Sequence, residues 1–452
     1  MTLPVLTGWK SAWSLRYWDF LTRSASKARQ LDQLTVVASA VFFLMICVLR
    51  NGELAASGYS ITAAAVLLTW SVRGNYLHPC FLFATPWTLI LFVSTLRISE
   101  YSRPIGAETQ LLVSGVIWLA VLVASAANLR PIASLSATST VYYSRRNFYV
   151  ILGLLLTLTA ANVALAGYIP LLRGIGGGGT DYMDFGVPGI YGFYNAFANV
   201  FAVTSFVLYV VSGQRTYLYG LLMVLAIFVV FVTRQNLISA LIECMAVWSL
   251  LRGRVSTFRL ALLGCVALVA FDLIGTLRAV DIRELARISP DYDFVPTALI
   301  WLYAYAYFNI LNLDNVTGDH LLPLHDGSMF WGLLPSIFRP EGGYEVQLEV
   351  SNFNVASYLS SVYTDVGVEG SFVVTAIFLI LAVSSFRRAQ SSRSPLYVVT
   401  AAVLQFCCLF SFFVNFFFYL PIIFQIPIAA MFRKIWLTSY PGAPQEPGIS
   451  SQ

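Results

Sequence analysis

The sequence has few charged residues. Lys and Arg number 27 and Asp and Glu 22, which makes 11% of the 452 residues charged, whereas soluble proteins carry about 25%. Apolar residues make up 58% of the chain and the mean hydropathy is +0.74. A chain of this composition cannot cover its apolar surface in water. The composition therefore excludes a soluble globular protein and favours a polytopic membrane protein.

Cysteine and histidine are also scarce. All six Cys fall inside or at the edge of apolar segments, so we predict small buried hydrophobic side chains rather than disulfides or metal ligands; they are Cys47, Cys80, Cys244, Cys265, Cys407 and Cys408. Of the three His, His320 and His325 lie close in sequence, but no third ligand converges at zinc spacing, so no metal is predicted. The net charge of +5 does not indicate a nucleic-acid partner, because it is spread between membrane segments.

Apolar runs that are long enough, or nearly so, to cross a bilayer recur about twelve times. They lie roughly at 33–50, 55–72, 79–97, 110–128, 147–169, 190–212, 216–232, 235–251, 257–275, 366–386, 396–413 and 415–432. This pattern predicts an all-α membrane protein with about twelve transmembrane helices. A further apolar run, Leu299 to Leu313, predicts an amphipathic helix on or partly in the membrane, with a thirteenth crossing as the alternative.

The distribution of Lys and Arg predicts the orientation. With the N-terminus in the cytoplasm, 18 of the 27 fall on the inner side and nine on the outer side, as the positive-inside rule requires. The chain then divides into a cytoplasmic or interfacial segment (1–32), helices one to nine (33–275), one large outer loop (276–365), helices ten to twelve (366–432) and a cytoplasmic tail (433–452).

The nine outer Arg run against this bias, so each needs a physical reason. Snorkelling from helix ends explains Arg50, Arg97 and Arg103. Arg234 lies between two apolar runs with almost no loop, where placing Arg at depth costs about 2.5–3.5 kcal/mol. A guanidinium matches phosphate oxygens bidentately, so we predict an anion contact at Arg234, with snorkelling as the alternative. We predict the same at Arg278, where the ninth run ends, with a solvated ion pair as the alternative.

Other outer side chains are weaker candidates. Arg173 precedes a run of four Gly and could contact phosphate or be an ordinary loop residue. If the chain after Arg278 stays helical, Arg283 and Arg287 share a face at i, i+4 spacing, with a solvated ion-pair helix as the alternative.

Two His and one Asp could act as a base. His320 and His325 each have an adjacent Asp, which can raise the basicity of an imidazole, although ordinary loop His remains open. Asp365 lies where the chain re-enters the membrane, where it could be a base or could cap the tenth helix.

Several short features occur in one order: Thr233-Arg234, Arg278, Leu334-Pro335-Ser336, Asn352, Tyr363 and Asp365-x-Gly367-x-x-Gly370. In this order the chain resembles the Wzy-type polymerases of bacterial surface polysaccharides, including O-antigen polymerases. The resemblance covers mainly residues 230–386, and the N-terminal half is similar only in being helical.

The resemblance implies a GT-C-like membrane glycosyltransferase of the bacterial inner membrane with its site facing the periplasm. It would transfer a growing glycan from undecaprenyl diphosphate onto a new lipid-linked repeat unit, without a metal or another cofactor. Arg234 and Arg278 would hold the diphosphate, and His320, His325 or Asp365 would take the acceptor proton. Substrate contacts would come from Arg173, Arg283, Arg287, Arg339, Asn352 and Tyr363. Membrane lipids and a chain-length regulator are the other expected partners.

Two other functions fit part of the pattern. An O-antigen ligase would transfer the same donor to lipid A–core and would also use an outer-loop His. A flippase of lipid-linked oligosaccharide should carry charge inside several spans, whereas here such charge is scarce, with Glu243 and Asp272 as the clearest cases. The Asp-x-Gly re-entry favours the polymerase.

Overall fold

The computed structural model of the chain describes residues 68, 76–128, 144–175, 185–187, 189–252, 264, 281–319, 321–340, 342, 346–351, 353, 356–392 and 394–436. In these ranges all regular secondary structure is helical, and a single isolated bridge, Ser99 to Ile288, is the one β contact. The N-terminal segment, the first two predicted membrane helices, nearly all of the ninth and the C-terminal tail lie outside the described residues.

Thirteen α-helices are described, together with four 3₁₀ turns. The α-helices are α3 (Pro79–Ser94), α4 (Ala107–Asn128), α5 (Arg145–Ala166), α6 (Pro170–Ile175), α7 (Tyr191–Ser212), α8 (Arg215–Val230), α9 (Arg234–Arg252), α11 (Ile282–Leu285), α12 (Thr297–Thr317), α13 (Tyr358–Ser392), α14 (Pro395–Leu409), α15 (Leu420–Ile423) and α16 (Gln425–Trp436). The 3₁₀ turns are η1 (Pro290–Tyr292), η2 (Ser328–Leu333), η3 (Ser336–Phe338) and η4 (Phe416–Phe418).

Four of the described helical segments are long and apolar enough to cross a membrane: Ala107–Asn128, Arg145–Arg173, Tyr191–Ser212 and Tyr358–Ser391. Four more are apolar but shorter: Pro79–Ser94, Arg215–Val230, Pro395–Leu409 and Leu420–Arg433. The described chain is therefore that of a helical membrane protein, as predicted. The total of about twelve crossings stays a prediction.

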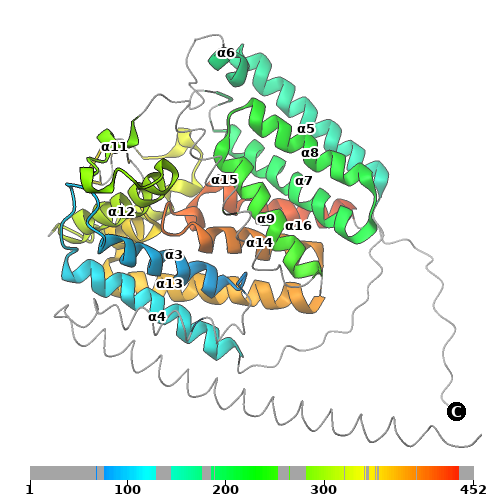
Figure 1. Ribbon diagram of the computed structural model, residues 1–452. Helices are drawn as coiled ribbons and strands as arrows, with labels where there is room; N and C mark the ends of the chain where they lie inside the picture. The colour runs from blue at the N-terminus through cyan, green and yellow to red at the C-terminus, as the bar shows by residue number, and fades with distance from the viewer. Residues whose placement is uncertain are drawn as a thin grey trace, which may run out of the picture.

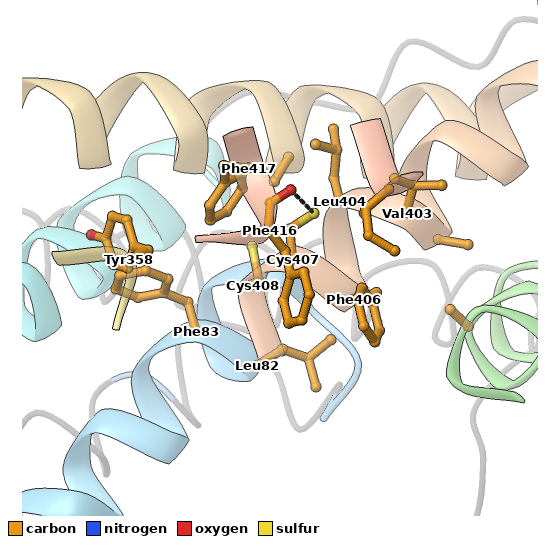
Figure 2. Packing of buried hydrophobic residues seen from close by; sticks show 14 of the residues in the cluster. Leu82, Phe83, Tyr358, Val403, Leu404, Phe406, Cys407, Cys408, Phe416 and Phe417 are labelled. Carbon is orange, nitrogen blue, oxygen red and sulfur yellow. Dashed lines mark hydrogen bonds between the residues drawn. The ribbon is translucent and has the colours of Figure 1, made fainter. Parts of the chain in front are cut away.

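Helix α14 lies at the centre of the bundle and packs against α3, α7, α9, α13 and α16. One group, α3, α4, α12 and α13, lies on one side of it, and α5, α7, α8 and α9 lie on the other (Figure 1). Figure 2 shows the hydrophobic core around the C-terminal end of α14, where Cys407 and Cys408 pack among Phe406, Phe416 and Tyr358.

The predicted burial of cysteine is confirmed where it can be seen. The thiol of Cys407 donates to the Phe416 carbonyl at 3.6 Å (Figure 2), and Cys80 and Cys244 are buried free thiols as well. Cys47 and Cys265 lie outside the described residues.

Three contacts join segments that the charge pattern assigns to the same side of the membrane. At the predicted outer end, Glu100 N–H donates to the Arg287 carbonyl at 2.9 Å. At the predicted inner end, Arg252 donates to the Val210 carbonyl at 2.8 Å, and Arg387 donates to a carbonyl at the end of α4. Segments that the charge pattern assigned to one side therefore lie together.

Two membrane helices differ from the prediction. The tenth was expected at 366–386, but α13 begins at Tyr358 and runs to Ser392, with a break at Gly367 (φ 67°, ψ −165°). The twelfth was expected as one run at 415–432, but the chain forms η4, α15 and α16 there. Pro421 explains part of the second difference, since proline stops a preceding helix and is favoured in the first turn of the next.

The predicted helix at Leu299–Leu313 exists as α12 but is not amphipathic. From Tyr303 to Thr317 no side chain is exposed, because α3, α4, α11 and α13 surround the helix. The prediction of an amphipathic helix is therefore wrong for this part of α12, which is an internal helix in the described part of the chain.

The side chain of Arg103 does not simply snorkel from a helix end, as predicted, but is held by partners within the protein. Its guanidinium forms an ion pair with Asp314 of α12 and donates to Asn315 Oδ1 at 2.7 Å. The Asp314 carboxylate also accepts from Gly106 N–H at 2.7 Å and from the Thr109 hydroxyl at 2.6 Å. This network fixes the α3–α4 connection onto α12 and explains why a carboxylate can be buried there.

Candidate functional site

The segment 324–339, which we call the strap, crosses the predicted outer end of the bundle. At one end, Leu324 N–H donates to the Thr364 carbonyl at 2.8 Å and His325 N–H to the Asp365 carbonyl at 3.1 Å. In its middle, η2 packs on η4, α13 and α15. At the other end, Ile337 packs against Gly189 just before α7. The strap thus joins the α13 break to the start of α7.

The break in α13 explains why the strap attaches there. A left-handed residue at Gly367 interrupts the i to i+4 ladder, so the carbonyls of Thr364 and Asp365 lose their helical donors. The backbone N–H groups of the strap replace those donors, and the Asp365 carboxylate accepts from Gly327 N–H at 2.9 Å. The Gly-x-x-Gly spacing predicted a re-entry, and the structure places a helix break at its first Gly.

Asp365 is therefore a structural anchor in the described part of the chain. The residue is 3% exposed, and its carboxylate accepts a hydrogen bond from Gly327 in the strap. By contrast, the side chain of His325 is exposed, with the backbone in the left-handed region (φ 56°). Of the two base candidates that the structure describes, only His325 has an exposed side chain.

Substitutions of Asp365 distinguish a role as the anchor of the strap from a role as a base. We expect Asp365→Asn to keep most activity, because an amide oxygen can still accept from Gly327 N–H, while Asp365→Ala should destabilise the strap by about 1–3 kcal/mol. Thermal unfolding in detergent measures the stability, and glycan chain extension, the activity that the sequence resemblance implies, measures the second effect. Equal loss of activity in both variants, with unchanged stability, would instead make Asp365 the base.

The middle of the strap depends on Gly332. A Cβ added there would lie 2.2 Å from the Phe418 carbonyl oxygen, a backbone atom that cannot rotate away. We expect Gly332→Ala to lower stability by about 1–3 kcal/mol and to expose the strap to limited proteolysis. Gly153→Ala is the control, since its Cβ would meet nothing within 4 Å and alanine favours a helix. Resistance of Gly332→Ala to protease at the wild-type level would contradict this packing.

The turn between α8 and α9 holds Arg234 in a strained setting. Val232 has φ 56°, a region that a β-branched residue rarely adopts. The turn lets α9 begin directly at Arg234, whose side chain is partly buried. Backbone N–H groups at a helix start have no intrahelical acceptors, so Arg234 stands at a point already favourable for an anion.

Other polar side chains face the same turn. Tyr419, just before α15, lies beside the Gln235 side chain and within electrostatic reach of Arg339 at the end of the strap. Tyr191, the first residue of α7, lies beside Asn195, and this end of α7 packs on α15, where Gly192 approaches Leu420. We call these residues, together with Arg234, the rim site: Tyr191, Asn195, Arg234, Gln235, Arg339 and Tyr419.

Arg173 approaches the same region from α6. Its guanidinium lies over the Tyr168 ring, 4.6 Å from the centroid. The rings of Tyr168 and Tyr191 both contact Phe185, with centroids 5.7 and 5.6 Å from it. The side chain of Arg173 is exposed. Of the arginines singled out in the sequence, Arg173, Arg234 and Arg339 are thus brought to one region.

Arg283 and Arg287 are not part of this region. Helix α11 ends at Leu285, and Arg287 has φ 43°, so the predicted shared helix face is wrong. Arg283 donates to the Tyr292 carbonyl at 3.3 Å and pairs with Asp293 at 3.6 Å. Arg287 lies over the Tyr101 ring, 5.0 Å from its centroid.

Tyr363 contacts the bundle rather than an open site. Its hydroxyl donates to Glu108 at 2.7 Å, and its side chain is 5% exposed. Arg278, His320 and Asn352 lie outside the described residues, so their predicted roles remain predictions. In the ranges that are described, no group of three His, Cys, Asp or Glu is placed to hold a metal ion.

The rim site combines two guanidinium groups, two side-chain amides and two phenols near the start of α9. Groups of this kind can bind and neutralise an oxyanion, as in phosphate recognition. Tyr419, Tyr191 and Gln235 were missed in the sequence because they lie in apolar runs, where aromatic residues are ordinary interface anchors. Only the fold brings 191, 235 and 419 together.

Comparison of the chain with protein-family models, with curated proteins and with solved structures finds no match.

Proposed function

We propose that the protein is a membrane glycosyltransferase that polymerises oligosaccharide repeat units carried on undecaprenyl diphosphate, at the outer face of a bacterial inner membrane. The observation that carries the proposal is the rim site, where Arg234 begins α9 and the next residue, Gln235, lies beside Tyr419, which Arg339 approaches. A diphosphate at the membrane interface is the anion that suits a guanidinium-lined site at a helix end.

The strap supplies a physical link between leaving group and acceptor. The rim site holds the departing diphosphate and stabilises its charge. At the other end of the strap, the exposed His325 is the candidate base for the acceptor hydroxyl. A packed strap with η2 fixed on η4 keeps the two ends at a set separation, which favours transfer between two bound lipid-linked substrates.

An O-antigen ligase is the second candidate, because an exposed histidine in an outer segment suits that transfer too. A deletion strain separates the candidates. A polymerase defect leaves lipid A–core capped with a single repeat unit, whereas a ligase defect leaves it uncapped. Repeat units accumulating on the cytoplasmic face would contradict both and point to a flippase.

A further inference from the structure

A carboxyl group is buried inside the helix bundle, away from the rim site. Glu243 lies in the third turn of α9 and is 0% exposed. Gln425, the first residue of α16 and also 0% exposed, donates its amide to Glu243 Oε1 at 3.2 Å. The pair joins two helices in the interior, at the side of α14 that faces α7 and α9.

Each partner of this pair retains one oxygen without a hydrogen bond. Glu243 Oε2 and Gln425 Oε1 are both buried with no partner among the described residues. Both atoms are acceptors, so the pair lacks a donor. Leaving a buried acceptor unpaired is unfavourable, and leaving a carboxylate ionised without a partner is far more so.

No neighbouring cation offsets the charge of an ionised Glu243. Among the described side chains of α7, α8, α13, α14 and α16, no Lys, Arg or His interacts electrostatically with the Glu243 carboxyl group. The titratable groups facing it are the thiols of Cys244 and Cys407, which cannot supply a positive charge. The flanking residues of α9, Ala240 and Val247, are apolar and buried.

A row of polar side chains leads from the rim site toward this pair. Asn199 of α7 donates to Asn236 at 3.5 Å and accepts from Ser239 at 3.3 Å. This register places Thr204, whose hydroxyl also has no partner in the described chain, level with Glu243. Nine residues of helix separate Arg234 from Glu243, which is about 14 Å along the axis.

We propose that Glu243 and Gln425 form a binding site for one exchangeable proton inside the bundle. The proton resides on Glu243 Oε2 and is donated to Gln425 Oε1, while the Gln425 amide donates to Glu243 Oε1. This acid–amide pair satisfies both unpartnered oxygens and leaves no buried charge. A hard metal cation would need about six oxygen ligands, more than the unpartnered oxygens of Glu243, Gln425 and Thr204 provide.

Release of this proton would act on the rim site. Helix α9 begins at Arg234, and α16 follows Tyr419 through the short α15, so the pair links the two elements that form the rim. An ionised Glu243 would draw water between α9 and α16 and loosen that link. The proton site does not depend on the proposed function. Only the identity of the ligand at the rim site rests on that function.

Infrared spectroscopy of the purified full chain tests the proton directly. At neutral pH we expect the carbonyl stretch of a protonated carboxylic acid that shifts in D₂O and disappears in Glu243→Gln. Glu349→Gln is the control and should leave that band unchanged, because Glu349 is a partly exposed ion-pair member. Absence of the band, or a melting temperature that rises with Na⁺ or K⁺ in wild type but not in Glu243→Gln, would overturn the proposal.

A swap of the two residues provides a second readout. Glu243→Gln alone should keep the wild-type melting temperature, because an amide–amide pair is also neutral and fully bonded. Gln425→Leu should lower it by removing both partners of the acid. The double variant Glu243→Gln/Gln425→Glu should recover the band and the melting temperature. A double variant that melts as low as Gln425→Leu would contradict a shared proton.

Discussion

Replacing Arg234 with Ala should reduce glycan chain extension by about 10²–10³-fold, the loss expected when one charge-stabilising donor is removed from a transfer site. The reason is local. Arg234 begins α9 beside the strained Val232, and the rim site loses one of its two guanidinium groups without it. Glycan ladders at matched protein levels measure the effect. Arg234→Lys should recover only part of the activity, since Lys cannot bind two phosphate oxygens in the fork geometry.

Arg252→Ala is the matched control for this experiment. Arg252 lies at the opposite end of the same helix and donates to the Val210 carbonyl at 2.8 Å, far from the rim. Its loss should change stability modestly and leave the ladder intact. Normal ladders in Arg234→Ala would remove the rim site as the place of diphosphate binding.

Replacing Asp314 with Ala should produce the largest loss of stability, about 2–4 kcal/mol. The carboxylate is 6% exposed and serves Arg103, Gly106 N–H and the Thr109 hydroxyl together. Removing it leaves these donors unpaired at the contact between the α3–α4 connection and α12. Thermal unfolding of the purified protein in detergent measures the effect.

Asp293→Ala supplies the comparison for Asp314. Asp293 also pairs with an arginine, Arg283, at 3.6 Å, but its side chain is 74% exposed. Exposed ion pairs contribute about 0–1 kcal/mol, so this variant should unfold close to wild type. Similar melting temperatures for the two variants would show that burial does not govern the Asp314 network.

The sequence predicted the parts of the fold that depend on composition. Apolar runs located the described membrane helices, and the Lys and Arg bias grouped the loops that the structure brings together, such as those of Glu100 and Arg287. Arg234 was singled out because an arginine with almost no flanking loop is costly in a membrane. These signals are local, so they can be read without knowing the packing.

Features that depend on tertiary packing could not be predicted. Helix α12 is apolar over its length, and periodicity alone cannot tell an internal helix from one on a membrane. Arg103 resembled a snorkelling side chain until its partner Asp314, 211 residues away, was placed beside it. The break at Gly367 turned Asp365 from a candidate base into the anchor of the strap.

The central claim is that the rim site binds a lipid-linked diphosphate. Direct binding of undecaprenyl diphosphate to the purified full chain, compared between wild type, Arg234→Ala and Arg252→Ala, tests it most directly. The account predicts saturable binding that weakens at least about tenfold in Arg234→Ala, a loss of roughly 1.4 kcal/mol or more, and is unchanged in Arg252→Ala. Equal affinity in all three proteins would contradict it.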